Sequence, residues 1–376
     1  MTVGQEVMDS SSAWLLYGAN GYTGRLIADL AVAEGARPVL AGRQPAKIHA
    51  LAERLDCPSL AFSLDSPDEI VRNLAGVRAV LHCAGPFCDT ARPMLEACLQ
   101  AGVHYLDITG EYDVIEWAGQ QDKRALAAGV VVMPAVGFDV VPSDCLAASL
   151  AGALPDADEL MLAFTGDSTL SHGTMQTVWR NVRRGGCVRR EGRLVRIPIG
   201  GDFEDISFPS GTRPAMAIPW GDIASAYHTT GIPNIEVRVG LPQRQANFVR
   251  RWRWLLPLGG LPPIQALGRW WIRRTVQGPS EAELTKGRIE FFGRARIRSG
   301  ETAEAMLLTP NGYRLTAHAA LAVLQAVLDG RVSPGFHTPA GALGAEFVQQ
   351  LPDIEFRWIQ RPEEKHDSEV PPDAEL

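Results

Sequence analysis

A run of three glycines between an apolar strand and an amphipathic helix restricts the fold of this chain more than any other sequence feature. The run, Gly18-Ala19-Asn20-Gly21-Tyr22-Thr23-Gly24, follows the apolar stretch Trp14–Tyr17 and opens a predicted helix. In such turns one glycine permits the tight bend, one lets a pyrophosphate approach the backbone, and one lets the helix pack on the strand. The helix N-terminus presents free N–H groups and a positive dipole end to phosphates. The run therefore predicts a dinucleotide site formed by Gly18, Asn20, Gly21, Tyr22, Thr23 and Gly24.

The same junction begins a regular alternation of strands and helices. Short apolar runs predict buried parallel strands, and amphipathic stretches predict the helices between them. The predicted strands are Trp14–Tyr17, Pro38–Ala41, Leu60–Phe62, Ala79–His82, Tyr105–Ile108 and Val130–Met133, and the first helices are Gly24–Glu34, Pro45–Leu55 and Pro67–Leu74. Such a sheet is covered on both faces and binds ligands at the carboxyl ends of its strands. The pattern predicts an α/β fold with a Rossmann doubly wound parallel sheet.

Beyond about Leu154 the pattern changes, and strand-like segments dominate. They are Glu159–Phe164, Asn234–Leu241, Arg288–Arg298 and Thr302–Thr309, with a tight hairpin turn at Ser299-Gly300. Thr174–Arg184 is the clearest helix there, and Tyr313–Leu328 is a long helix expected to pack back on the first domain. We expect an inserted α+β second domain with a mixed or antiparallel sheet. The expected division is a disordered N-terminus at 1–12, an NADP-binding Rossmann domain at 13–154, a substrate domain at 155–310, C-terminal elements at 311–352 packing on the Rossmann domain, and a disordered acidic tail at 361–376.

The end of the second strand predicts NADP(H) as the cofactor in preference to NAD(H). An NAD site usually carries Asp or Glu there, to hold the ribose 2′-hydroxyl. Here the strand ends Gly42-Arg43, and a guanidinium can pair with a 2′-phosphate and stack on adenine. Lys47, one helical turn further on, either adds charge to this site or is a solvated surface residue. Asp65 either accepts from the adenine amino group or caps the helix that begins near Pro67.

The fourth strand leads into Cys83-Ala84-Gly85-Pro86-Phe87, which we place beside the ribose and nicotinamide. Small residues let the backbone pass close to the cofactor, and Phe87 could pack near the nicotinamide. The thiol of Cys83 is expected to be a small core group, and His82 a hydrogen-bonded buried histidine.

With these residues in place, the chain resembles the saccharopine dehydrogenase-like oxidoreductases, and most closely the branch of trans-acting enoyl reductases of mycobacterial lipid synthesis. The resemblance rests on Tyr17–Gly24, Leu40–Arg43, Cys83–Phe87, Glu96–Cys98, Tyr105–Glu111 and Gly137–Asp144, and is weakest between about 185 and 285. It implies an NADP-dependent Rossmann domain completed by C-terminal elements, and an inserted domain that shapes the substrate pocket. In lysine-pathway relatives the substrate is an amino-acid adduct, and in the enoyl reductase branch it is a lipid-linked double bond. No amino-acid-binding site is recognised in this sequence, which favours a hydrophobic small-molecule substrate.

Hydride transfer needs the nicotinamide held against the acceptor carbon, together with a proton source. Glu111 and Asp139 are the predicted acid or base, because both follow the ends of strands five and six. A neutral carboxyl there would need burial to raise its pKa. Tyr105 is a third candidate donor, although its place within a strand also fits core packing. Asp107 could equally orient loops by accepting backbone N–H bonds.

Two further polar segments could have either a structural or a functional role. Ser143 or Asp144 is expected to be the N-cap of the helix that runs to Leu154. His172-Gly173-Thr174 either touches the substrate or simply precedes a helix with an exposed histidine, and the second interpretation is favoured.

Composition excludes several classes of function. A formal net charge of −7 and a pI near 5.7 argue against nucleic-acid binding, which needs a basic face. The six cysteines show no CxxC pair or zinc-ligand spacing, so we expect reduced thiols and no metal. The N-terminus lacks the pattern of a signal peptide, and no apolar run is long enough to span a bilayer. These features predict a cytoplasmic protein.

One segment, 244–274, differs from the rest of this acidic chain. It contains seven arginines, no acid, and the four tryptophans Trp252, Trp254, Trp270 and Trp271 around an apolar centre broken by Pro and Gly. Arginine beside tryptophan suits a membrane interface, so peripheral membrane contact is one hypothesis. A subunit interface, as in a homodimer, or a partly buried loop is the alternative.

The sequence supports two hypotheses for function. The first is an NADP(H)-dependent oxidoreductase acting by hydride transfer on a hydrophobic or lipid-linked enoyl, or an imine, substrate. The second is a non-catalytic NADP(H)-binding scaffold or redox sensor at a membrane surface, because the cofactor motifs are clearer than any catalytic residue.

Overall fold

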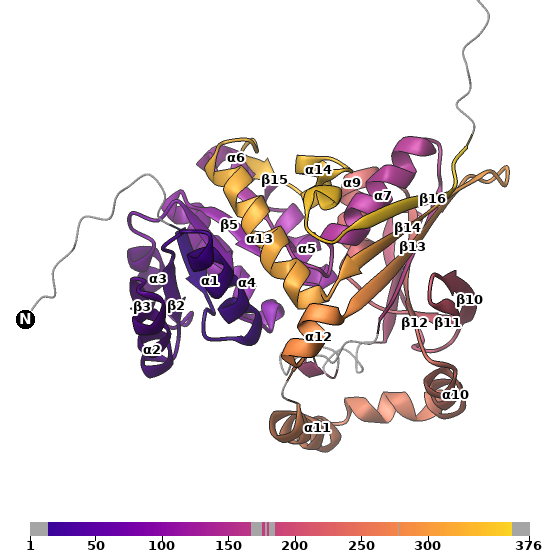
Figure 1. Cartoon of the computed structure of the whole chain (residues 1–376), viewed down its shortest axis with the longest axis horizontal. Helices are drawn as coiled ribbons and strands as arrows, with labels where there is room; N and C mark the ends of the chain where they lie inside the picture. The colour runs from indigo at the N-terminus through magenta and orange to yellow at the C-terminus, as the bar shows by residue number, and fades with distance from the viewer. Residues whose placement is uncertain (1–13, 167–174, 177–178, 180–184, 277, 363–376) are drawn as a thin grey trace, which may run out of the picture.

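Two sheets with the helices packed on them make up most of the described part of the protein, and one of several hydrophobic clusters extends across both. The computed structural model describes residues 14–166, 175–176, 179, 185–276 and 278–362. Figure 1 shows the first sheet with its helices in indigo and purple, except for the orange to yellow α13 and β15, and the second sheet to its right in magenta to yellow. A single core cluster includes Leu16, Leu106, Leu150, Phe291 and Ala320 and so joins the two sheets.

The first sheet is the predicted Rossmann sheet. Its strands are β1 (Trp14–Tyr17), β2 (Val39–Gly42), β3 (Ser59–Ala61), β4 (Ala79–His82), β5 (His104–Asp107), β6 (Val131–Met133) and β15 (Gly335–Phe336). They lie in the order β15-β6-β5-β4-β1-β2-β3, and every pairing is parallel. The predicted fold class is confirmed. Sequence reasoning missed β15, because a two-residue strand has no periodicity to detect.

Helices cover this sheet on both faces. They are α1 (Tyr22–Ala33), α2 (Pro45–Leu55), α3 (Pro67–Asn73), α4 (Phe87–Ala101), α5 (Tyr112–Gly119), α6 (Asp122–Ala128) and α13 (Gly312–Leu328). Helix α13 packs against α1 and also contacts β4 and β14, so a C-terminal helix completes the N-terminal sheet. The division of the chain at 13–154, 155–310 and 311–352 remains a prediction.

Two predicted helix caps are wrong. The N-cap of α3 is Ser66, so Asp65 does not cap that helix. Helix α7 (Val141–Ala153) begins earlier than expected, with Val140 at its N-cap and Pro142 in its first turn, where proline is tolerated. Ser143 and Asp144 therefore lie inside the helix. The carboxyl of Asp144 accepts hydrogen bonds from the Thr229 hydroxyl and the Ala340 N–H, at 2.6 and 2.9 Å.

The second sheet is mixed, as predicted. Its strands are β7 (Glu159–Gly166), β8 (Gly186–Arg190), β9 (Arg193–Ile197), β10 (Phe203–Phe208), β11 (Gly211–Ala217), β12 (Asn234–Gly240), β13 (Arg288–Arg296), β14 (Thr302–Pro310) and β16 (Glu355–Gln360). Strands β7 and β12 pair in parallel, whereas the other pairs are antiparallel. The predicted β13–β14 hairpin is present, and its turn contains Gly300 at φ 100°. Helices α7 and α9 (Asp222–Thr230) pack on this sheet.

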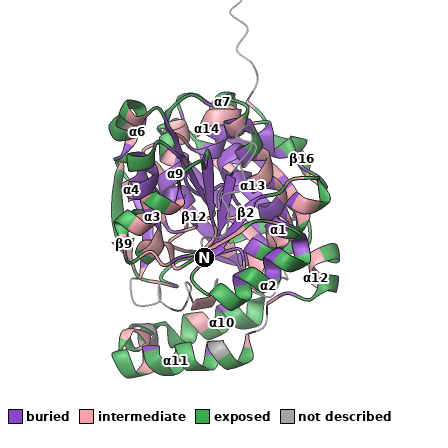
Figure 2. Cartoon of the chain, turned by 90° about the vertical axis from the view of Figure 1, so that its left-hand side faces the viewer, coloured by how far each residue is buried: buried purple, intermediate pink, exposed green. Residues whose placement is uncertain are grey.

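The second half of the chain contains more helix than the sequence indicated. Helix α10 (Gln243–Trp252), the 3-10 helix η2 (Arg253–Gly260) and helix α11 (Pro262–Thr275) follow one another, and α12 (Glu281–Lys286) and α14 (Pro339–Leu343) come later. Helices α10 and α11 lie at the bottom of Figures 1 and 2, where most of their surface is exposed. None of the described helices combines the length and hydropathy that crossing a bilayer requires. The predicted helix Thr174–Arg184 and the two predicted disordered termini lie largely or wholly outside the described residues.

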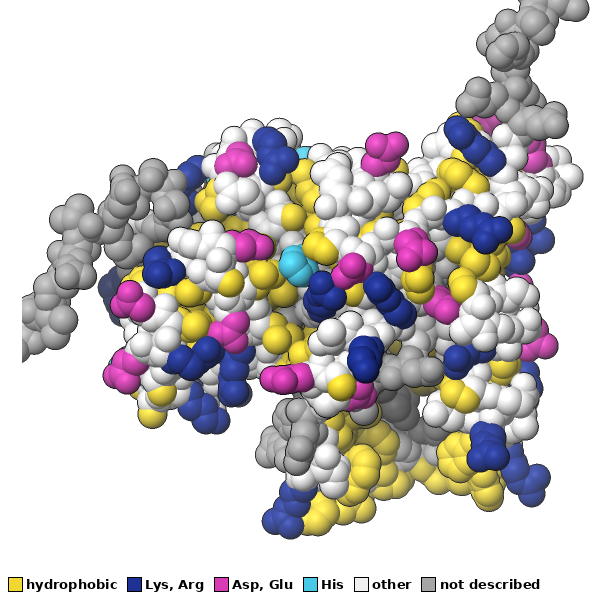
Figure 3. Space-filling view, in the orientation of Figure 1, with side chains coloured by type: hydrophobic (Ala, Val, Ile, Leu, Met, Phe, Trp, Pro, Cys, Tyr) yellow, Lys and Arg dark blue, Asp and Glu magenta, His cyan; other side chains and the backbone are white. Residues whose placement is uncertain are grey.

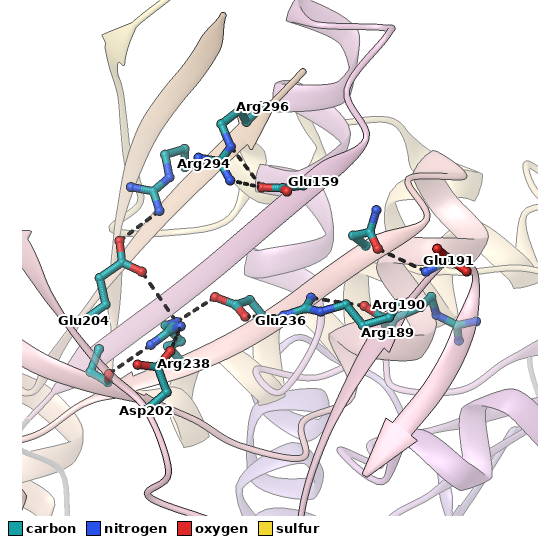
Figure 4. A network of polar contacts seen from close by, with 12 residues as sticks. Glu159, Arg189, Arg190, Glu191, Asp202, Glu204, Glu236, Arg238, Arg294 and Arg296 are labelled. Atoms are coloured by element: carbon teal, nitrogen blue, oxygen red, sulfur yellow. Dashed lines mark hydrogen bonds and ion pairs between the residues drawn. The ribbon is translucent and has the colours of Figure 1, made fainter. Parts of the chain in front are cut away.

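Arg238 on β12 is the centre of a polar network on this sheet (Figure 4). Its guanidinium is buried and contacts Glu236 at 2.8 Å, Asp202 at 2.9 Å and Glu204 at 3.8 Å. Glu236 also binds Arg190, so the network connects β12 with β8 and β10. Burial raises the pKa of Glu236, but Arg238 and Arg190 lower it by more than burial raises it. The pKa therefore lies below its ordinary value.

We expect Arg238→Ala to lower the free energy of unfolding by about 2 kcal/mol, because it removes a buried guanidinium and leaves the partly buried Glu236 with Arg190 as its remaining cation. Arg298→Ala is the control. Arg298 forms an ion pair with Asp158 but is largely exposed, so the free energy of unfolding should change by under about 0.5 kcal/mol. Urea unfolding measures both. The stability from Glu236 is present above its unfolded pKa and is lost as pH falls through the lower folded pKa, so the difference between wild type and Arg238→Ala should shrink in acid. Equal midpoints for the two variants at neutral pH would contradict this role.

Candidate functional site

The glycine turn after β1 admits no side chain at two of its three glycines. Gly18 has φ +84°, and a Cβ there would lie 2.8 Å from the Ala84 backbone nitrogen. A Cβ on Gly24 would lie 2.3 Å from the Gly18 carbonyl oxygen, so the third glycine lets α1 pack on the turn. The Gly18 and Ala19 N–H groups both donate to the Ala41 carbonyl oxygen, at 2.8 and 3.1 Å. The turn is therefore held between β2 and the loop after β4.

The N-terminus of α1 is open for an anion. Gly21 is its N-cap, is exposed, and provides no side-chain cap for the first N–H groups. Asn20, Tyr22 and Thr23 are partly buried around it. The Tyr22 hydroxyl donates to the Pro279 carbonyl oxygen at 3.0 Å, and its ring meets Tyr313 edge-on at 5.0 Å. The backbone fits a pyrophosphate, because a Cβ would fill the cradle that the glycines leave clear.

Of the groups predicted to recognise the adenosine end, Arg43 follows β2, Asp65 comes after β3, and Lys47 is in the first turn of α2. Arg43, Lys47 and Asp65 are all exposed. The charges of Arg43 and Asp65 both act on the Tyr17 hydroxyl, whose pKa burial raises to about 12. Gly42 adjoins Asn20 of the glycine turn, since a Cβ there would lie 3.1 Å from the Asn20 amide oxygen. The exposed Arg43 thus directly follows a residue that adjoins the turn.

The loop after β4 runs alongside the glycine turn. Cys83 and Ala84 are partly buried, Gly85 is exposed, and the Gly85–Pro86 peptide is cis. The Phe87 ring meets His82 edge-on at 5.4 Å. His82 is buried as predicted, with its Nε2 hydrogen-bonded to the Thr90 hydroxyl at 3.0 Å, and burial lowers its pKa to about 3. Its Nδ1 has no partner among the described residues, so the expected hydrogen bonding is only half met.

Glu111 is held by the backbone at the start of α4. Its two carboxyl oxygens accept from the N–H groups of Phe87 and Cys88, at 2.9 and 3.1 Å. Burial raises the pKa of Glu111, while these hydrogen bonds oppose the rise. A carboxylate that accepts backbone N–H groups at a helix N-terminus stabilises that terminus. This geometry makes Glu111 an anchor for the loop that carries Phe87.

Asp107 joins the loops that follow β5 and β6. One oxygen accepts from the N–H groups of Thr109 and Ala135, each at 2.9 Å, and the other accepts from the Tyr105 hydroxyl at 2.6 Å. The alternative that Asp107 orients loops is therefore confirmed. Tyr105 is fully buried, and its hydroxyl is occupied by Asp107. Burial raises the pKa of Asp107 to about 6 against the effect of these bonds.

Asp139 differs from the other carboxyls of this edge. It is partly exposed, and within the described residues its carboxyl accepts no hydrogen bond, although its backbone carbonyl accepts from Trp220 Nε1 at 2.7 Å. Burial raises its pKa to about 7, and the Glu111 charge adds to the rise. The carboxyl lies against Gly110, where a Cβ would come within 2.4 Å of Oδ2. Asp139 thus has a carboxyl that can carry a proton near neutral pH and is not committed to the backbone.

Aromatic rings from the second domain lie beside Asp139. Phe138 meets Phe164 of β7 at 6.3 Å and Phe291 of β13 at 5.5 Å, and Phe164 meets Trp220 at 5.0 Å. The indole N–H of Trp220 also donates a hydrogen bond to the backbone carbonyl of Asp139. We call Phe138, Phe164, Trp220 and Phe291 the aromatic wall. Phe291 is buried and the other three rings are partly buried, and the wall adjoins the candidate acid through its neighbour Phe138 and its backbone bond to Trp220.

Sequence reasoning missed the aromatic wall and Asp222. Asp222, at the start of α9, is fully buried, and neither of its oxygens accepts a hydrogen bond of ordinary geometry within the described residues. Burial raises its pKa well above the usual value, and the charges of Asp144 and Asp139 act in the same direction. Strands and loops far apart in sequence supply these groups, so no local spacing could have indicated them. His172 lies outside the described residues, and these hold no group of three or more metal-ligating side chains.

Comparisons with known proteins agree with this geometry. The family described as the saccharopine dehydrogenase NADP binding domain matches residues 14–133. The chain is 33% identical over 138 residues to the trans-acting enoyl reductase of Mycobacterium leprae, covering 35% of this chain and 33% of that protein. It is 29% identical over 200 residues to the enzyme of the same name from Mycobacterium bovis, covering 49% of this chain and 48% of that protein. These matches thus span less than half the length of each relative.

A solved structure extends the likeness to both sheets. The apo saccharopine dehydrogenase (L-Glu forming) of Saccharomyces cerevisiae superposes with a TM-score of 0.64 at 12% identity, covering 93% of this chain and 100% of that one. At that identity the likeness shows the fold. It supports the same pairing of a Rossmann sheet with a second mixed sheet, and a nicotinamide dinucleotide as the cofactor follows from the matched domain.

Proposed function

We propose that this chain is a saccharopine dehydrogenase-like oxidoreductase that uses NADP(H) to reduce a hydrophobic enoyl or imine substrate by hydride transfer. The observation that carries the proposal is the aromatic wall beside Asp139. A dicarboxylate amino-acid adduct would need cations at this position, whereas an apolar acyl chain gains from contact with aromatic rings. The enoyl reductase relatives point in the same direction.

We assign residues of the chain to each part of the dinucleotide. The glycine turn and the α1 N-terminus would hold the pyrophosphate, and Arg43 the 2′-phosphate, with Lys47 and Asp65 beside it. Cys83, Ala84, Gly85, Pro86 and Phe87 would line the ribose and nicotinamide. A reduced nicotinamide, when bound, supplies a hydride to the substrate carbon.

Asp139 is assigned as the proton donor. Reduction of a double bond adds a hydride to one atom and a proton to the other, so the carboxyl leaves each turnover as a carboxylate and regains its proton from solvent. A pKa near 7 keeps a substantial fraction protonated at neutral pH, which an ordinary aspartate would not. Glu111, Asp107 and Tyr105 act as positioning residues: Glu111 holds the Phe87 loop, and Asp107 with Tyr105 joins the two loops that present Gly110 and Asp139.

Following the absorbance of NADPH tests the proposal. The probes assayed with NADPH are a 2-enoyl thioester with a medium-length alkyl chain and an imine with an apolar substituent. Saccharopine, a saturated amine that can only be oxidised, is the polar comparison and is assayed with NADP+. We expect NADPH oxidation with an apolar probe and no NADPH formation with saccharopine. Tight NADP(H) binding without turnover of any probe would favour the non-catalytic scaffold, and turnover of saccharopine alone would reject a hydrophobic substrate.

Arg43→Ala is expected to reduce the preference for NADP(H) over NAD(H) by about ten- to a hundredfold, because it removes a charge-assisted contact of about 1.5–3 kcal/mol. Calorimetric titration with both dinucleotides measures the ratio. Arg54→Ala is the control, since Arg54 lies at the far end of α2 and binds Asp29. An unchanged ratio of affinities after Arg43→Ala would reject the 2′-phosphate role.

A further inference from the structure

Helix α11 has an inner face that packs and an outer face that does not. On the inner face Gln265 and Ile272 are buried, and Gly268 approaches Trp179 so closely that a Cβ would clash with its ring. Gln265 and Trp179 exchange hydrogen bonds through their side chains and carbonyl groups. These contacts hold the helix in a defined orientation on the protein.

The outer face of α11 is apolar and exposed. Leu267, Trp270 and Trp271 occupy i, i+3 and i+4 positions, and Leu267 is 64% exposed. Arg274 continues the stripe and lies over the Trp270 ring at 4.6 Å. An amphipathic helix of a soluble protein normally buries its apolar stripe, whereas this helix buries another face and leaves the stripe outside.

Helix α10 and η2 extend the same surface. Phe248 and Trp252, four residues apart on α10, and Trp254 on η2 are exposed, with Phe248 at 65% and Trp254 at 67%. Their three rings are neighbours in space: the ring centroids of Phe248 and Trp252 are 6.5 Å apart, and those of Trp252 and Trp254 are 6.3 Å apart. Figure 3 shows hydrophobic side chains gathered along the underside formed by α10 and α11, with basic side chains at both ends.

The charge of this surface is opposite to that of the whole chain. Between positions 237 and 280 there is no acidic residue, whereas segment 244–274 holds seven arginines in a chain with a net charge of −7. Exposed members are Arg244, Arg250, Arg251, Arg253, Arg269 and Arg274. Tryptophan and arginine around an apolar stripe match the headgroup region of a bilayer, where rings enter the acyl boundary and guanidinium groups meet phosphates.

We propose that the outer surface of α10, η2 and α11 docks on an anionic phospholipid bilayer. Arginines at both ends of an exposed apolar strip favour a flat acidic surface over a protein groove, which would have to enclose three separate elements. The segment is also connected to the cofactor turn, because Pro279, a few residues beyond α11, accepts a hydrogen bond from Tyr22. Docking would therefore place the dinucleotide end of the site close to the lipid surface. The inference stands independently of the substrate proposed above.

Co-sedimentation of the full chain with vesicles tests the proposal. One vesicle type contains phosphatidylcholine with phosphatidylglycerol, and the other phosphatidylcholine alone. We expect binding to the anionic vesicles at least about tenfold stronger than to the neutral ones, weakening as salt is raised. Trp270→Ala with Trp271→Ala, and separately Arg251→Gln with Arg269→Gln, should each reduce that binding about tenfold.

Matched controls separate docking from misfolding. Leu126→Ala removes an equally exposed apolar side chain from α6 and should leave vesicle binding unchanged. Thermal unfolding of the tryptophan variant should match wild type, since its two rings are exposed; if it does not, Arg251→Gln with Arg269→Gln provides the test. Equal vesicle binding by wild type and both variants, or no binding by wild type to anionic vesicles, would overturn the proposal. A dimer in size-exclusion chromatography that the tryptophan variant abolishes, without vesicle binding, would assign the surface to a second copy instead.

Discussion

Asp139→Asn is expected to lower turnover by about 10²–10⁴-fold while leaving NADP(H) affinity within about twofold of wild type. The amide keeps the shape of the carboxyl against Gly110 but cannot donate an acidic proton. Asp139 adjoins the aromatic wall through Phe138 and Trp220 and lies away from the glycine turn, so the loss should fall on kcat and leave cofactor affinity intact. Single-turnover rates and calorimetric titration measure the two quantities. Asp156→Asn, on an exposed surface, is the control.

The pH profile gives this prediction a second test. A proton donor acts in its protonated form, so turnover should fall as pH rises above the pKa of Asp139, about 7. This fall, the alkaline limb of the pH profile, should be absent from the residual activity of Asp139→Asn. Since the Glu111 charge raises the pKa of Asp139, Glu111→Gln should move the limb to lower pH. A limb that survives unchanged in Asp139→Asn would assign the proton to another group.

Gly24→Ala should lower the free energy of unfolding by about 3 kcal/mol and weaken NADP(H) binding about a hundredfold. The new methyl would lie 2.3 Å from the Gly18 carbonyl oxygen and 2.9 Å from Ala19 Cα, so α1 must move away from the turn. The N–H groups of its first turn would then no longer face the pyrophosphate. Urea unfolding and calorimetric titration measure both effects.

Gly152→Ala is the matched control for this change. Gly152 lies in α7, and a Cβ there meets nothing within 4 Å. The same substitution should therefore raise the free energy of unfolding by about 0.5 kcal/mol, because alanine loses less backbone entropy than glycine in a helix. Two glycine-to-alanine changes in helices thus have opposite expected signs. If Gly24→Ala behaved like Gly152→Ala, the close packing of α1 on the turn would not be required for the site.

Local patterns predicted the Rossmann half well. Strands β1 and β4 and helix α2 have the predicted bounds, and the other early elements differ by one or two residues. A buried strand or an amphipathic helix is specified by the alternation of residues within it, which the sequence displays directly. Helices α10 and α11 were missed because proline and glycine interrupt the apolar centre of segment 244–274, and these residues hid the helical spacing on either side of it.

The two candidate acids show what local sequence patterns could not predict. Glu111 and Asp139 looked equivalent in the sequence, since each is an acid just after a parallel strand. In the folded chain Glu111 accepts two backbone N–H groups from α4, whereas the Asp139 carboxyl has no such bonds among the described residues and lies against Gly110. The two carboxyls differ through their neighbours, and those neighbours come from distant parts of the chain.

The sequence alone determined the parallel sheet, the glycine turn and the place of Arg43, because backbone conformation and side-chain alternation are properties of a few consecutive residues. Tertiary structure decided which acid is free to carry a proton and what surrounds it. A pKa depends on burial and nearby charge, and Phe138, Phe164, Trp220 and Phe291 meet beside Asp139 only when the second sheet packs against the first.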